Sequence, residues 1–353
     1  MNLQTHAWID RLPWPLARRL KGLFAPPHGY AYRFSAEPLV LMIPEDHFEE
    51  HERWEPLFQT LRHRRVYFLG LVRSAVERDP AYEQLILPVL ERHRQRFPRH
   101  QFIFLANNAA QTALFSRLGI ESAFINQNCL ANEALYRPLP QAPKAFDAIH
   151  NGAMAPYKRH ELAAGVRSLA VVTYLQRRHM GYFETMAQGL GHAHWLNFGE
   201  RGLEPGNFTL MTPQDVNLQL NRSRVGLCLS EVEGSMFASI EYLLAGLPVV
   251  STPSFGGRDI FFDERYVEIV EPSPDAVAAA VARQAARQLD PLEIREATLA
   301  RMREHRARLA ALLSDIARRE GGALDGAALL SRLLPDDVYK LRPLHTLVRA
   351  AGV

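Results

Sequence analysis

The sequence has little cysteine and no long apolar run. Its two cysteines, Cys129 and Cys228, lie far apart and form no Cys-x-x-Cys pair. This excludes a disulfide framework and a cysteine-based zinc site, and it fits a reducing compartment. No stretch approaches the roughly 18 apolar residues of a membrane span, and the N-terminus lacks the continuous hydrophobic segment of a signal peptide. We therefore expect a cytoplasmic protein.

Lysine is also scarce, and arginine supplies nearly all of the positive charge. The 353 residues include 41 basic and 38 acidic side chains, so the net charge of +3 is too small to indicate nucleic acid as a partner. Hydrophobic residues at 47% and charged residues at 22% are ordinary values for a soluble globular protein. At about 100–200 residues per domain, the length suggests two domains. The lysines are Lys21, Lys144, Lys158 and Lys340.

Several chemical motifs are missing as well. The sequence has no Gly-x-Gly-x-x-Gly and no Gly-x4-Gly-Lys-Ser/Thr, which argues against dinucleotide oxidoreductases and P-loop NTPases. No Asp-x-Asp pair is present to hold a metal on a diphosphate. The histidines of His47–His51 have metal-ligand spacing, but Phe48 stands where the zinc-protease motif needs glutamate. We expect no metal and no cofactor.

One N-terminal segment, residues 7–24, mixes tryptophan and leucine with arginine and lysine. Such a segment can lie on an anionic membrane surface, which would make the protein peripheral on the inner face of the cell membrane. Packing on the body of the protein is the simpler alternative, because Pro13 and Pro15 interrupt any long helix.

Short apolar strands alternate with helical patterns in two sets. The proline-rich segment Arg137–Pro143 separates them as a semi-rigid linker. The alternation predicts an α/β protein with two doubly wound, Rossmann-like domains, residues 1–140 and 141–323, and a helical tail, 324–353, packed back on the first domain. Ligands of such sheets bind outside the carboxyl ends of the strands, so we expect the site in the cleft between the domains. The predicted strands are Leu39–Ile43, Val66–Val72, Phe102–Leu105, Ala123–Ile125, Ala148–Asn151, Leu169–Tyr174, His194–Asn197, Val225–Leu229, Pro248–Ser251 and Val267–Val270, and the predicted helices are Tyr82–Phe97, Ala109–Leu118, Tyr182–Gly189, Ser235–Leu244 and Pro291–Arg319.

The most informative stretch runs from Ser230 to Gly257. A buried strand ends at Ser230, a tight turn follows, and a helix is predicted from Ser235. The backbone N–H groups of Gly234, Ser235 and Met236 would then be unpaired and directed at the cleft. Such a helix start is an anion site suited to a diphosphate.

Two glutamates flank this helix start. Glu233 and Glu241 are eight residues apart, about two helical turns, and so lie on the same side. The first carboxylate can accept hydrogen bonds from sugar hydroxyls, and the second can bind a vicinal diol such as ribose with both oxygens.

This segment resembles the donor-binding motif of GT-B-fold retaining glycosyltransferases, in particular glycosyltransferase family 4 (glycosyl transferases group 1). The family pattern is Glu-x7-Glu, a small residue followed by Gly-x-Pro-Val-Val, and then Gly-Gly. Here the acidic positions are Glu233 and Glu241, the strand entry is Ala245–Val250, and the glycine pair is Gly256-Gly257.

A second match lies upstream, where the family has Gly-Arg-x4-Lys and uses both cations on the nucleotide phosphates. Gly152 and Lys158 fill the outer positions, and Ala153 stands in place of the arginine. A lysine at this position is informative in a chain that otherwise uses arginine. Either Arg159, directly after Lys158, replaces the missing cation, or the diphosphate depends on Lys158 and the helix start.

Other positions depart from the family pattern. Glu-Gly-Phe-Gly is here Glu233-Gly234-Ser235-Met236, which changes the shape near the donor sugar. The first 125 residues match only in their strand–helix rhythm and have no glycine-rich first loop, so the acceptor site is unspecified.

The resemblance implies a GT-B enzyme, metal-independent and without a cofactor. It would transfer a hexosyl or related group, with retention, from a nucleotide diphosphate sugar to a glycan, lipid-linked or other acceptor, as in polysaccharide biosynthesis. Two alternatives stay open: a GT-B-fold phosphorylase, and a non-catalytic sugar-nucleotide-binding module. The implied catalytic residues are Glu233 and Lys158, and the implied substrate-binding residues are Gly152, Arg159, Gly234, Ser235, Met236 and Glu241.

Overall fold

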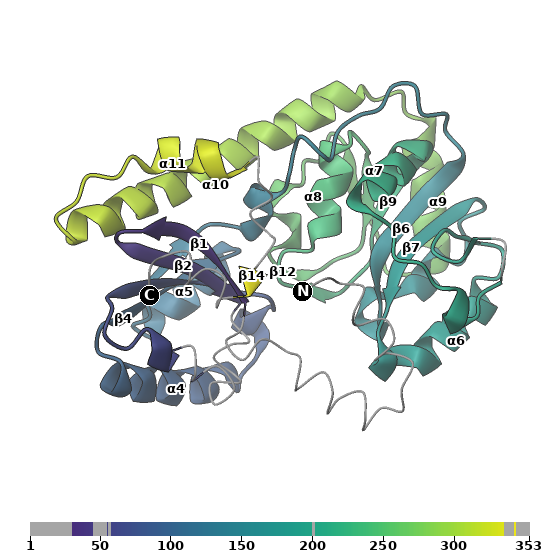
Figure 1. The fold of residues 1–353 in the computed structure, drawn as a ribbon. Helices are drawn as coiled ribbons and strands as arrows, with labels where there is room; N and C mark the ends of the chain where they lie inside the picture. The colour runs from purple at the N-terminus through teal and green to yellow at the C-terminus, as the bar shows by residue number, and fades with distance from the viewer. Residues whose placement is uncertain (1–29, 45–54, 56–57, 200–201, 335–341, 344–353) are drawn as a thin grey trace.

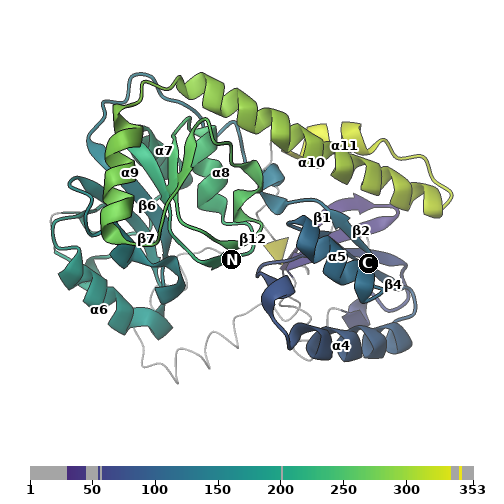
Figure 2. The ribbon, with the colours of Figure 1, turned by 180° about the vertical axis from the view of Figure 1, so that it is seen from behind.

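The computed structural model describes residues 30–44, 55, 58–199, 202–334 and 342–343. Two α/β domains lie side by side, and a long helix, α10 (Pro291–Arg319), runs along one side of both (Figures 1 and 2). The membrane hypothesis for residues 7–24 and the His47–His51 pair both lie outside the described residues. Within the described ranges, no helix is long and apolar enough to cross a membrane.

The first domain contains a six-stranded sheet of order β14-β1-β2-β3-β4-β5. Strands β2 to β5 are parallel and follow one another in chain order, whereas β1 and β14 add two antiparallel strands at one edge. This differs from the expected doubly wound pattern, because β1 and β2 form a hairpin and the strand order does not reverse. The elements are β1 (Tyr30–Ala36), β2 (Leu39–Pro44), β3 (Val66–Leu71), α4 (Tyr82–Arg96), β4 (His100–Ala106), α5 (Ala109–Arg117), β5 (Ser122–Phe124) and β14 (Arg342–Pro343).

The second domain contains a fully parallel sheet of order β13-β11-β9-β6-β7-β8. Its first strand, β6, is central, and the winding direction reverses between β6 and β9. This is the doubly wound order, as predicted, and it creates a switch point where the two strands diverge. The elements are β6 (Phe146–Met154), β7 (Leu169–Leu175), α6 (Met180–Gly189), β8 (His194–Trp195), α7 (Pro213–Arg222), β9 (Ser223–Cys228), α8 (Phe237–Leu244), β11 (Val249–Ser251), β13 (Val267–Ile269) and α9 (Pro274–Ala286).

Apolar side chains on both faces explain why the strands read as continuous hydrophobic runs. In β2, Leu39, Leu41 and Ile43 pack in one core with α4 and α5, while Val40 and Met42 face the opposite way into the core that α10 covers. Successive side chains of a strand point to opposite faces, so a strand covered by helices on both sides is apolar throughout.

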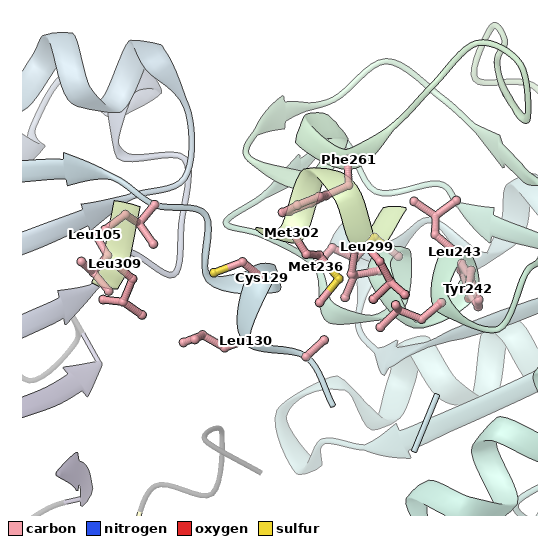
Figure 3. Packing of buried hydrophobic residues seen from close by; sticks show 14 of the residues in the cluster. Leu105, Cys129, Leu130, Met236, Tyr242, Leu243, Phe261, Leu299, Met302 and Leu309 are labelled. Carbon is pink, nitrogen blue, oxygen red and sulfur yellow. The ribbon is translucent and has the colours of Figure 1, made fainter. Parts of the chain in front are cut away.

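Helix α10 belongs to the packing of both domains and has the predicted bounds. Its Leu299 and Met302 lie in the core with α8 of the second domain, and Leu309 lies near Leu105 of β4 in the first (Figure 3). The helix begins with Pro291 after Asp290, whose side chain accepts a hydrogen bond from the Leu292 N–H. Helix α11 (Gly326–Leu333) then packs back on α10.

Truncation at Leu309 should therefore destabilise the protein, whereas the same change at Leu292 should not. Leu309 is 0% exposed and Leu292 is 59% exposed on the same helix. Leu309→Ala should lower the free energy of unfolding by about 2–5 kcal/mol, and Leu292→Ala should change it by less than about 0.5 kcal/mol. Urea unfolding at equilibrium measures both, and equal losses would contradict the bridging role of α10.

Candidate functional site

A pocket lies at the carboxyl ends of β6 and β9, between the two domains. This is the switch point of the second sheet, where ligands of doubly wound folds bind. The first domain contributes two lining residues and the second domain the rest. All predicted site residues except Arg159 line it. The lining residues are Arg73, Gln127, Asn151, Gly152, Ala153, Tyr157, Lys158, Tyr174, Glu233, Gly234, Ser235, Met236, Phe237, Ala238 and Glu241.

The two residues that the resemblance implies as catalytic form one ion pair. Lys158 ends the short 3-10 turn after β6, and its Nζ contacts Oε1 of Glu233 in strand β10 (Val232–Glu233). The side chains are only 9% and 10% exposed. Because removing one partner of a buried ion pair is strongly destabilising, each of these side chains holds the other in place.

Glu241 lies about one turn into α8 and lines the same pocket. The side-chain amide of Asn151 donates to its Oε2 at 3.0 Å. Burial raises the pKa of Glu241 to about 7, although hydrogen bonds from Tyr136 and Asn151 act in the opposite direction. Near neutral pH the carboxyl group is therefore close to its midpoint between the neutral and ionised forms.

The helix start differs from the prediction by two residues. Helix α8 begins at Phe237 rather than Ser235, and the side-chain amide of Asn128 donates to the Ser235 carbonyl at 2.5 Å. This contact with the first domain holds the chain out of the helix. The N–H groups of Gly234, Ser235 and Met236 therefore do not belong to the first turn of the helix, contrary to the expectation from the sequence. The positive end of the helix dipole lies at Phe237 and Ala238, which line the pocket.

Met236 precedes the helix in the left-handed region, with φ of 50°. The glycosyltransferase family that this segment resembles has glycine at this position. Glycine adopts this backbone conformation without steric cost, whereas for another residue the conformation costs about 1–2 kcal/mol of free energy. The Met236 side chain is 6% exposed and packs in the apolar core near Met302 (Figure 3). Burial of this side chain offsets part of the backbone strain.

Arg159 does not take the place of the arginine missing at Ala153. Its Nε donates to the Leu229 carbonyl at 2.6 Å, and its Nη2 donates to Thr252 Oγ1 at 2.8 Å. The guanidinium therefore connects the segments that follow β9 and β11, outside the pocket. The structure therefore does not support the hypothesis that Arg159 supplies the second phosphate cation, because the guanidinium group is engaged by the Leu229 carbonyl and the Thr252 hydroxyl.

Two glycines of the motif allow the domains to touch. A Cβ on Gly234 would lie 2.5 Å from the carbonyl carbon and oxygen of Arg73, and a Cβ on Gly257 would lie 2.3 Å from the Asn107 Cβ. Real Cβ atoms do not approach so closely, so both positions need glycine. The side-chain amide of Asn126 donates to the Gly257 carbonyl at 2.7 Å and closes the same contact.

Sequence reasoning missed several residues that line the pocket, including three with large polar side chains, and one that supports it. Arg73, Tyr157 and Tyr174 line the pocket, and Arg258 is completely buried behind it. Arg258 donates to the carbonyls of Ser230 at 2.6 Å and of Thr252 at 2.5 Å, which holds the loops on either side of Glu233. Only their positions in the sequence could have indicated the two arginines. Arg73 directly follows a predicted strand, and Arg258 directly follows the glycine pair.

Comparison with known proteins gives structural matches only. No protein-family model and no curated protein matches the sequence. Among solved structures, HepE from Anabaena, crystallised with UDP, has a TM-score of 0.56 at 14% identity over 76% of this chain and 82% of its own. Sucrose-phosphate synthase from Thermosynechococcus elongatus has a TM-score of 0.55 at 15% identity over 78% and 79%. TarM from S. aureus, crystallised with fondaparinux, alpha-GlcNAc-glycerol and UDP, has a TM-score of 0.51 at 11% identity over 88% and 57%.

These matches and the two-domain architecture define the class. The chain has a GT-B fold like that of the group 1 glycosyltransferases, with two α/β domains and the pocket between them. The predicted α/β, GT-B fold class and the resemblance in fold are thereby confirmed, except that the first sheet is not doubly wound.

The raised pKa of Glu241 makes stability depend on pH. Between its ordinary pKa of 4.5 and the folded value of about 7, the folded protein keeps a proton that the unfolded chain has lost. This contribution to stability is therefore complete below pH 4.5 and is lost as the pH rises through 7. Glu241→Gln should raise the melting temperature relative to wild type more at pH 8 than at pH 5.

Thermal unfolding at both pH values measures this difference. Glu304→Gln, on an exposed side chain of α10, is the matched control for the loss of one carboxyl group. A Glu241→Gln difference that is the same at pH 5 and pH 8 would contradict the assignment.

Proposed function

We propose that the protein is a retaining glycosyltransferase that transfers a sugar from a nucleotide diphosphate sugar to a glycan, lipid-linked or other acceptor. The observation that carries this proposal is the gathering of Lys158, Glu233 and Glu241 in one pocket at the switch point of the second domain. The structures of HepE and TarM with UDP support a nucleotide-sugar donor, since both proteins have the same fold.

The pocket suits the three parts of such a donor. In this proposal Glu241, which accepts a hydrogen bond from Asn151, binds both ribose hydroxyls when its carboxyl group is ionised. The start of α8 and the ammonium group of Lys158 provide positive potential for the diphosphate. Glu233, at the end of β10, is then the carboxylate beside the donor sugar, and its ion pair with Lys158 links the positions of sugar and phosphate.

The proposed step breaks the bond between the anomeric carbon and the diphosphate oxygen. The acceptor oxygen bonds to that carbon on the same face, and its proton passes to the departing phosphate. The negative charge that develops on the nucleoside diphosphate is stabilised by groups that are already in place, which is where fixed charges contribute most to catalysis. In this mechanism no separate base is required.

The two glutamates should have separable roles. Glu233→Ala should leave the affinity for the nucleoside diphosphate intact or stronger, because it removes a negative charge beside Lys158. Its turnover should fall on the order of 100-fold, since the anomeric carbon is no longer oriented. Glu241→Ala should instead weaken the binding of the nucleoside diphosphate by about 1–3 kcal/mol, because the contacts with ribose are lost.

Calorimetry with UDP, GDP and ADP first identifies the base, and turnover of the matching sugar donor follows for both variants. Loss of nucleotide binding in Glu233→Ala together with normal binding in Glu241→Ala would reverse the assignment. A wild-type protein that binds the nucleotide but turns over no donor with any acceptor would be a binding module. Formation of a sugar phosphate from glycan and inorganic phosphate would indicate a phosphorylase.

The proposed reaction should not need a divalent metal, because Lys158 and the start of α8 are assigned to the charge of the leaving group. Turnover of the sugar donor should be the same with EDTA as with added Mg²⁺ or Mn²⁺. Activity that EDTA abolishes and Mg²⁺ restores would contradict metal independence while leaving the glycosyl transfer itself in place.

A further inference from the structure

The second domain leaves its share of the pocket without a surplus of positive charge. Lys158 is paired with Glu233, Ala153 carries no charge, and Arg159 is held at Leu229 and Thr252 outside the pocket. Glu241 adds a further carboxyl group to this wall. A nucleoside diphosphate brings at least two negative charges, so the lining residues of this domain alone do not balance it.

Arg73 also lines the pocket, and it comes from the first domain, just after the carboxyl end of β3. Its main chain packs against Gly234, the residue next to Glu233, at a distance that excludes any side chain there. The preceding residue is also fixed, because the Val72 carbonyl accepts hydrogen bonds from the side chains of Asn107 at 2.6 Å and Gln127 at 2.9 Å. The arginine therefore projects from a rigid base.

The charge of Arg73 acts inside the pocket. Burial and the nearby Glu233 raise the pKa of Tyr157, to about 12, and the positive charges of Arg178 and Arg73 oppose that rise. Tyr174 has the same two arginines as neighbours. Of these two, Arg73 lines the pocket and Arg178 does not.

We propose that Arg73 is the second cation of the diphosphate site, contributed by the first domain in place of the arginine missing at Ala153. This inference rests on the proposed function. A guanidinium group donates two parallel hydrogen bonds to phosphate oxygens, whereas the ammonium group of Lys158 acts as a point charge. The two cations then come from different domains, and the site is complete only where both domains meet.

The test compares Arg73→Ala, Arg73→Lys and Arg178→Ala by calorimetry with UDP and with uridine, or with the pair of the base that wild type prefers. Arg73→Ala should weaken the binding of UDP about 10- to 100-fold, which is the usual effect of losing a charged hydrogen bond. The affinity for uridine should not change. Arg73→Lys should retain part of the UDP affinity, and Arg178→Ala should bind UDP within about twofold of wild type. Folding is preserved in the design, because the main chain of Arg73 makes the contact with Gly234.

Three results would overturn the inference. The first is an affinity for UDP that is the same in Arg73→Ala and wild type. The second is a lower affinity for UDP in Arg178→Ala with no change in Arg73→Ala. The third is equal weakening of UDP and uridine in Arg73→Ala, which would show that the arginine only supports the domain contact. If wild type binds none of UDP, GDP and ADP, the proposed function fails as well, and this outcome is visible before any variant is made.

Discussion

The pocket depends on one steric constraint, the direct contact of main chains between the two domains. Gly234 lies against the backbone of Arg73 and Gly257 against Asn107, and neither position has room for a Cβ atom. The side-chain amides of Asn126 and Asn128 donate across the same contact to the carbonyls of Gly257 and Ser235. This contact places Arg73 of the first domain among the residues that line the pocket.

Electrostatics then decide what this narrow pocket can bind. Lys158 and Glu233 form a buried ion pair, while burial raises the pKa of Glu241 to about 7. A pocket with balanced charges binds a sugar nucleotide only if further positive potential is available for the diphosphate. The start of α8 and Arg73 both line the pocket and are the sources of that potential that we propose.

The second domain could be predicted well because its signals are local. The apolar runs that form β6, β7 and β9 are each continuous in the sequence, and so is the motif that contains Glu233 and Glu241. The sequence also contains a typical helix start for α10, with Asp290 as the N-cap and Pro291 as the first helical residue. The first domain was predicted less well. Strand β1 alternates aromatic and polar residues and was missed, and its hairpin with β2 makes one edge of the sheet antiparallel.

The sequence by itself determined which residue types stand in the motif, the positions of most helices and strands, and the doubly wound order of the second sheet. The tertiary structure decided how those residues act, because each outcome depends on contacts between segments far apart in the chain. Arg159 donates to the Leu229 carbonyl and the Thr252 hydroxyl, Lys158 meets a carboxylate 75 residues away, and Met236 takes a conformation suited to glycine. Arg73 lies 161 positions before Gly234 in the sequence, yet its backbone touches it, and no local pattern encodes that distance.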